Sequence, residues 1–175
     1  MNVIQKMMFA TRIGLLRGTI MQSMIPDLEL LPLFSGVDAE HLALLRPLFE
    51  RVSFRAGTTV VEQGDPADFL YLIERGLLQI LYKPYDGEPI TITHVEVGGL
   101  FGWSAVVGSP NYTSSGIAVE DLETIRVRGS DLRRLCEENP EAGRAILDRL
   151  ASVVSTRWKD AHEQVRSMLK NGMKG

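Results

Sequence analysis

The stretch AGTTVVEQGDPADFLYLIERGLLQI, Ala56 to Ile80, decides the fold. Its β-branched and aromatic residues stand in short runs, which are separated by turn signals at Gly57, Gly64 and Gly76. Each run has about four to eight residues, which is the usual length of a strand and is too short for most helices. The stretch therefore predicts antiparallel strands joined by tight turns.

The same pattern continues on both sides of this stretch. It begins near Val52, and after a YDGE turn at residues 85–88 it returns in the run ITITHVEV. Two further short strands are expected to meet at Glu120 and Asp121. About eight short strands at even spacing, without long helices between them, predict a mainly β fold with flanking helices, an antiparallel β jelly-roll barrel.

Short helical pieces are expected before the strands, over residues 28–49. Asp38 is a candidate N-cap for the most regular of them, and Phe49 falls on its apolar face. Pro47 marks a break or a change of direction there, because proline cannot continue a helical hydrogen-bond ladder.

The helical period returns at Gly129, with Ser130 as the expected N-cap of a first helix and Pro140 in the first turn of a second. The second helix would have about thirty residues and a length of roughly 45 Å. Its near-heptad stripe comprises Leu147, Leu150, Val154, either Arg157 or Trp158, Ala161, Val165 and Met168. We therefore expect a homodimer through residues 140–170. The alternative is a helix that folds back onto its own β domain.

These elements divide the chain into three parts. Residues 1–29 are predicted to be an amphipathic helical extension, residues 30–139 the β-roll domain, and residues 140–172 the long C-terminal dimerisation helix. Arg12 and Arg17 interrupt the apolar residues of the extension, so we expect no membrane contact. Whether Met1 or Met24 is the natural start stays open.

The composition is that of an ordinary globular protein, with 175 residues, of which 45% are hydrophobic and 23% charged. A net charge of −3 provides no broad basic field for nucleic acid or an anionic membrane. The single cysteine, Cys136, fits a reducing compartment and is expected to be a small buried hydrophobe. We therefore expect a cytoplasmic protein.

The segment GGLFGWSAVVGSPNYTSSGIAV, Gly98 to Val119, has the outline of a phosphate-binding loop. Gly102 permits a close backbone approach, a short helix after it would present unpaired N–H groups to an anion, and Gly108 can end that helix. However, no lysine or arginine occurs between Pro84 and Ile125. The loop therefore has the shape of an anion site without the usual charges.

Together these motifs resemble the cyclic nucleotide-binding domain of the catabolite activator and protein kinase A regulatory type. The resemblance covers residues 30–169 and implies a double-stranded β-helix in which GGLFGWSAVVGSP, from Gly98 to Pro110, matches the phosphate-binding cassette. The cassette and the residues after it supply the expected ligand-binding residues: Phe101, Gly102, Trp103, Ser104, Ala105, Asn111, Tyr112, Thr113 and Ser114.

The sequence departs from this family at two ligand-binding positions. The resemblance implies a glutamate for the ribose hydroxyl where this chain has Trp103, and an arginine for the cyclic phosphate within Asn111 to Thr113, where it has none. A charge-assisted hydrogen bond contributes about 1.5–3 kcal/mol, so the loss of two would weaken binding a hundredfold or more. The hydroxyl groups of the loop could recover part of this loss.

Three interpretations of the loop stay open. It can bind a cyclic nucleotide (cAMP or cGMP) through altered contacts, or a different small ligand, neutral, aromatic or apolar, against Trp103. In the third interpretation the pocket is degenerate and filled by Trp103, and the domain is a ligand-free dimerising or partner-binding scaffold. We expect a regulatory or sensor domain that binds a small-molecule ligand in the β-roll, signals through the dimer helix, and has a partner protein.

Other function classes lack their motifs. No nucleophile–base set, P-loop or GxSxG motif is present, so we expect no enzyme and no catalytic residue. His41, His94 and His162 have no metal-ligand spacing with Cys136, so we expect no metal site. The family's transcription factors have a helix-turn-helix domain after the long helix, whereas NGMKG follows Lys170 here, so we expect no direct nucleic-acid contact.

Overall fold

The computed structural model describes residues 28–153, and the remainder of the expected extension and dimer helix lies outside the described residues. Short helices come first, as the sequence predicts: η1 (Leu28–Leu30), η2 (Pro32–Phe34), α2 (Ala39–Leu45) and η3 (Arg46–Leu48). The strands are β1 (Phe49–Phe54), β2 (Thr59–Val61), β3 (Phe69–Arg75), β4 (Leu78–Tyr82), β5 (Ile90–Val95), β6 (Leu100–Phe101), β7 (Ser115–Ala118) and β8 (Leu122–Arg128). Helix α3 (Ser104–Val107) interrupts them, and α4 (Gly129–Glu138) follows them.

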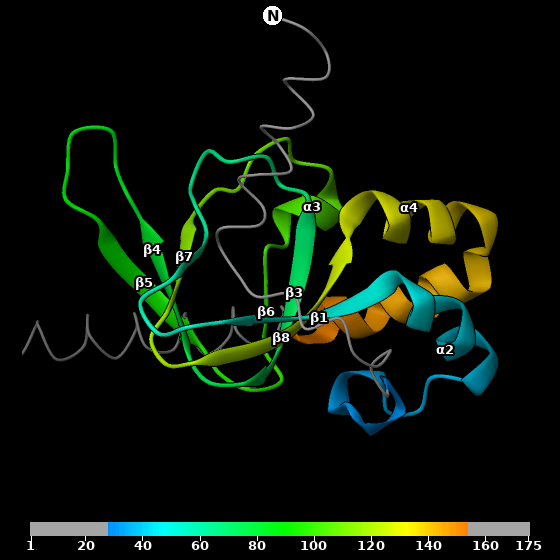
Figure 1. The fold of residues 1–175 in the computed structure, drawn as a ribbon. Coiled ribbons are helices and arrows are strands. Elements are labelled where there is room, and N and C mark those ends of the chain that lie inside the picture. The colour runs from blue at the N-terminus through cyan, green and yellow to red at the C-terminus, as the bar shows by residue number, and fades with distance from the viewer. Residues whose placement is uncertain (1–27, 154–175) are drawn as a thin grey trace, which may run out of the picture.

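The strands form two four-stranded antiparallel sheets with the orders β1-β8-β3-β6 and β2-β7-β4-β5 (Figure 1). The predicted jelly roll is confirmed. Its description as a barrel is wrong, because the two sheets are not closed into one continuous ring of strands. Side chains that pack between the sheets hold them together instead.

Strand β3 lies at the centre of the packing. Leu70 and Leu72 point into a core beneath the helices, whereas Tyr71 and Ile73 point into a second core between the sheets. A strand that is buried on both faces has no reason to alternate apolar and polar residues. This explains the continuous FLYLI run that marks the stretch in the sequence.

The helices gather on one face of the β1-β8-β3-β6 sheet, at the right of Figure 1. Residues 140–153 continue as a helix, whose Ala142, Ile146 and Leu150 are buried in the same core cluster as Leu28. Because Leu150 is only 1% exposed, it is not available to a partner helix, while Leu147 is 37% exposed. The division into three parts stays a prediction, since most of the two terminal segments lies outside the described residues.

Two local expectations differ from the structure, and a third, the N-cap at Asp38, is confirmed in position. Phe49 begins β1 and does not extend the preceding helix, because η3 around Pro47 redirects the chain one residue earlier. Helix α4 begins at Gly129 after Arg128 as N-cap, two residues earlier than Ser130 predicts. Asp38 does occupy the N-cap position of α2, but its side chain makes no capping hydrogen bond.

Candidate functional site

The candidate site is a pocket of about 380 Å³ beside α3. Its floor comes from both sheets, with Val61 on β2, Ile80 on β4, Val95 on β5 and Leu100 on β6. The loop of residues 102–114, which we call the cassette loop, forms the opposite wall. The pocket is therefore not closed by its own side chains, and its volume falls in the range of about 300–1,000 Å³ that is common for small-molecule sites.

The structure brings seven of the nine predicted site residues to the pocket: Phe101, Gly102, Trp103, Ser104, Tyr112, Thr113 and Ser114. Ala105 is buried behind the loop, where its carbonyl oxygen accepts a hydrogen bond from the Arg133 guanidinium of α4. Asn111 is exposed, and its Nδ2 donates to the Gly64 carbonyl oxygen at 2.6 Å. These two residues support the loop and do not face a ligand.

Sequence reasoning missed several residues of the pocket wall. Val61, Ile80 and Val95 lie on strands that are distant in the sequence from the cassette loop. Ile80 is two positions after the buried Leu78, so the alternation along β4 already placed both on the inner face. The sequence could not show that this face lies opposite the loop, because that depends on how the two sheets pack.

Gly102 and Gly108 shape the cassette loop. Gly102 has φ 80°, and a Cβ atom there would lie 2.5 Å from the Phe69 carbonyl oxygen, so only glycine fits without strain. Gly108 is in the left-handed region with φ 78° and ends α3, as the sequence predicts.

Tyr112 anchors the loop to β3. Its hydroxyl donates to the Phe69 carbonyl oxygen at 2.8 Å and accepts from the Phe69 amide at 3.0 Å. Burial raises the pKa of Tyr112 well above its ordinary value, and the neighbouring Tyr71 adds to this effect. The Tyr112 hydroxyl is therefore neutral and committed to the fold.

The short helix offers fewer free amides than its sequence suggests. The amides of Ala105, Val106 and Val107 all donate to carbonyl oxygens of Gly102 or Trp103 within the loop. The Ser109 hydroxyl likewise donates to the Asn111 carbonyl oxygen. Among the described residues that line the pocket, none carries a charge. The predicted absence of the two charged ligand contacts is therefore visible in the pocket itself.

Trp103 does not fill the pocket. Its partly buried side chain packs against the core beneath the helices, the residue also belongs to the pocket lining, and the volume of the pocket remains open. This arrangement gives no support to the interpretation in which Trp103 occupies the ligand's place.

Residues 28–153 contain neither a metal-binding cluster nor a membrane-spanning helix. Within that range, no group of three or more histidine, cysteine, aspartate or glutamate side chains is arranged to hold a metal ion. None of the helices in that range has the length and apolar content needed to cross a bilayer. His94 on β5 is exposed, away from the pocket lining.

The comparisons with known proteins agree with this fold and loop. The sequence profile of the cyclic nucleotide-binding domain matches residues 51–139, about half of the chain. The chain therefore belongs to the cyclic nucleotide-binding domain family, whose members bind cAMP or cGMP and are mostly regulatory. A solved cyclic nucleotide-binding domain from Methylobacillus flagellatus has the same fold, with a TM-score of 0.70 and 20% identity over 79% of this chain and 78% of that one.

Two relatives are of the catabolite activator and kinase regulatory types. The cyclic AMP receptor protein of Thermus thermophilus is 27% identical over 130 residues, which are 74% of this chain and 58% of that protein. The cAMP-dependent protein kinase regulatory subunit of Dictyostelium discoideum is 28% identical over 135 residues, which are 76% of this chain and 41% of that protein. The chain thus spans about half the length of these relatives.

Proposed function

We propose that this chain is a non-catalytic regulatory domain that binds a small molecule in the pocket and transmits binding through its C-terminal helices. The observation that carries this proposal is the open pocket of about 380 Å³ with the cassette loop as one wall. A ligand-free scaffold, the alternative interpretation, gives no reason for apolar side chains to line a space that is open to solvent, because exposing apolar surface to water is unfavourable.

The cassette loop has a direct connection to the helices. Arg133 of α4 donates to the Ala105 carbonyl oxygen, and Gly129 at the start of α4 packs so closely that a Cβ atom there would lie 2.6 Å from the Ala105 carbonyl carbon. A shift of the loop on ligand binding would therefore displace α4 and the helix that begins at residue 140. In this proposal the exposed Leu147 face and the residues beyond it form the dimer contact, and a partner protein recognises the geometry of that contact.

The first test is thermal unfolding of the protein with cAMP, cGMP or adenosine. A ligand at a hundred times its dissociation constant adds about 2.7 kcal/mol, which is a shift of about 5–10 °C for a chain of this size. Val107, which lines the pocket and is 63% exposed, can be replaced by tryptophan to obstruct the pocket without disturbing the core. We expect V107W to abolish any shift.

Hydrogen exchange tests the second half of the proposal. A bound ligand should slow amide exchange in α4 and in residues 140–153 as well as in the cassette loop. Protection confined to the loop would contradict signalling through the helices. A constant midpoint with all three compounds, and with the neutral dye N-phenyl-1-naphthylamine, would contradict ligand binding and favour the scaffold.

A further inference from the structure

The inner surface of the pocket is apolar on its floor and around its rim. Val61, Ile80, Val95 and Leu100 present aliphatic side chains, and the residues Trp103 and Val107 belong to the opposite wall. Such a surface favours ligands with a large apolar surface. Binding removes that surface from water, and this burial stabilises the complex.

Only neutral polar groups are available to a ligand. The hydroxyl groups of Ser104, Thr113 and Ser114 line the pocket, and none of them makes a hydrogen bond within the described part of the chain. The Tyr112 hydroxyl is occupied by Phe69. Three hydroxyls that can each donate or accept are suited to orient a carbonyl, ether or hydroxyl group of a ligand.

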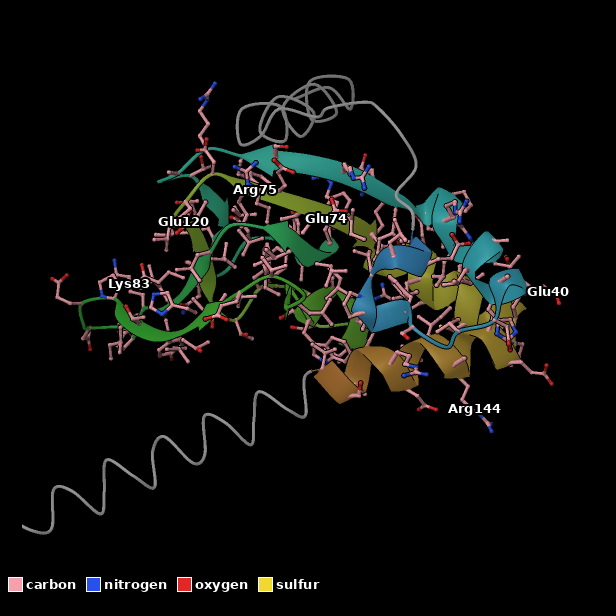
Figure 2. The ribbon with its side chains drawn as sticks, turned by 90° about the horizontal axis from the view of Figure 1, so that it is seen from below. Glu40, Glu74, Arg75, Lys83, Glu120 and Arg144 are labelled. Carbon is pink, nitrogen blue, oxygen red and sulfur yellow. The ribbon has the colours of Figure 1, made fainter. Side chains whose placement is uncertain are left out.

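Arg126, one of two arginines over the Phe69 ring, does not compensate for this lack of charge. Arg126 of β8 is 17% exposed, its Nε donates to the Glu50 carboxylate at 2.7 Å, and its guanidinium lies 4.0 Å from the centre of the Phe69 ring. It does not line the pocket. Charges elsewhere extend outward, as Figure 2 shows for Lys83 at one end of the molecule and Arg144 at the other. An anion in the pocket would therefore lose its hydration without gaining an oppositely charged partner among the described residues of the lining.

We propose that the ligand of this pocket is an uncharged, largely apolar ring compound with one or two neutral hydrogen-bonding groups, and not an anion such as a cyclic nucleotide. This inference rests on the proposed function, and it names the chemical class of the ligand. In this proposal Trp103, as a residue of the pocket wall, contacts the ring of the ligand, and the hydroxyls of Thr113 and Ser114 fix its orientation.

A matched pair of fluorescent probes tests the charge preference. N-phenyl-1-naphthylamine is neutral, and 8-anilino-1-naphthalenesulfonate has the same ring system with one sulfonate. Both become brighter in an apolar site, so one titration measures each dissociation constant. We expect the neutral probe to bind the wild-type protein at least tenfold more tightly than the sulfonate.

Two variants restrict the measurement to this pocket. Val107 and Val97 are both 63% exposed, but only Val107 lines the pocket. Probe binding is assigned to the pocket only if it is lost in V107W and retained in V97W.

Thr113→Arg, which places a cation in the pocket lining, tests the charge preference directly. It should improve binding of the sulfonate at least tenfold and leave binding of the neutral probe unchanged or weaker.

The outcomes separate this inference from the proposed function. Tighter pocket binding of the sulfonate or of cAMP than of the neutral probe by the wild-type protein would overturn the inference, while ligand binding itself would stand. If V107W alters the binding of no probe, both the inference and the proposed function fail. A neutral preference that T113R reverses supports both.

Discussion

The two sides of the cassette loop differ in how strictly the fold fixes them. On the side that faces the body, Gly102 leaves no room for a Cβ atom beside the Phe69 carbonyl oxygen, the Ala105 carbonyl accepts from Arg133, and the Tyr112 hydroxyl bonds to β3. On the side that faces the pocket, Thr113 and Ser114 present hydroxyls to open space. The body side keeps the outline of a family cassette, and the pocket side lacks its charges. Shape and ligand chemistry can therefore change independently in one loop.

The largest effect is expected from Gly102→Ala on the body side. Its Cβ atom would lie 2.5 Å from the Phe69 carbonyl oxygen in a backbone with φ 80°, so the free energy of unfolding should fall by at least about 3 kcal/mol. Gly98→Ala is the control, since Gly98 has φ 78° but no atom within 4 Å of the added Cβ, and it should lose only about 1–2 kcal/mol. Equal losses in urea unfolding would contradict the importance of the close approach.

Tyr112→Phe is expected to have the next largest effect. The variant removes the hydroxyl that donates to and accepts from the backbone of Phe69, and it leaves a partly buried amide without a partner. We expect a loss of about 1–3 kcal/mol in the free energy of unfolding. Tyr85→Phe, at a fully exposed position, should leave stability unchanged. If both variants were as stable as the wild type, Tyr112 would not anchor the loop.

Alkaline pH probes the same anchor without the loss of a side chain. Burial raises the pKa of Tyr112 and of Tyr71 above the ordinary value of 10.0, so above that pH the unfolded chain releases protons that the folded chain keeps. The free energy of unfolding should therefore fall by about 1.4 kcal/mol per pH unit for each of these tyrosines. Below pH 10 neither contributes a slope. Y112F should reduce the slope by about one proton, and an unchanged slope would show that Tyr112 titrates normally.

The sequence predicts the strands and the body side of the cassette loop, since both depend on local backbone preferences. Glycines at turns separated the strands correctly, the meeting of β7 and β8 at Glu120 and Asp121 is confirmed, and Gly108 ends α3 as expected. These features follow from the backbone preferences of single residues.

The pocket side and the open sheets could not be predicted in the same way. The floor of the pocket comes from Val61, Ile80 and Val95, which meet the loop only because two sheets pack face to face. Ala105 and Asn111 belong to the expected segment but point to α4 and to Gly64, a direction that spacing along the chain does not specify. The dimer stripe likewise included Leu150, whose burial depends on packing against the β domain.

Arg133→Met tests the connection between the body side and α4. The side chain is largely exposed although its hydrogen bond to the Ala105 carbonyl is partly buried, so we expect a loss of only about 1 kcal/mol. Arg134→Met is the matched control, because Arg134 is 61% exposed and pairs with Asp131 on the same helix, and it should change stability by less than about 0.5 kcal/mol. Faster hydrogen exchange at residues 105–109 in R133M alone would show that Arg133 positions the loop, and equal exchange in both variants would contradict this.

The smallest effect on stability is expected on the pocket side, from Thr113→Val and Ser114→Ala. Neither hydroxyl makes a hydrogen bond within the described part of the chain, so each variant should stay within about 0.5 kcal/mol of the wild type in urea unfolding. The same variants should weaken the binding of a neutral ligand with a carbonyl or hydroxyl group, because a hydrogen bond between neutral groups contributes about 0.5–1.5 kcal/mol. A stability loss as large as that of Y112F would show that these hydroxyls serve the fold. The contrast between a body side that stabilises the fold and a pocket side that serves a ligand would then not hold.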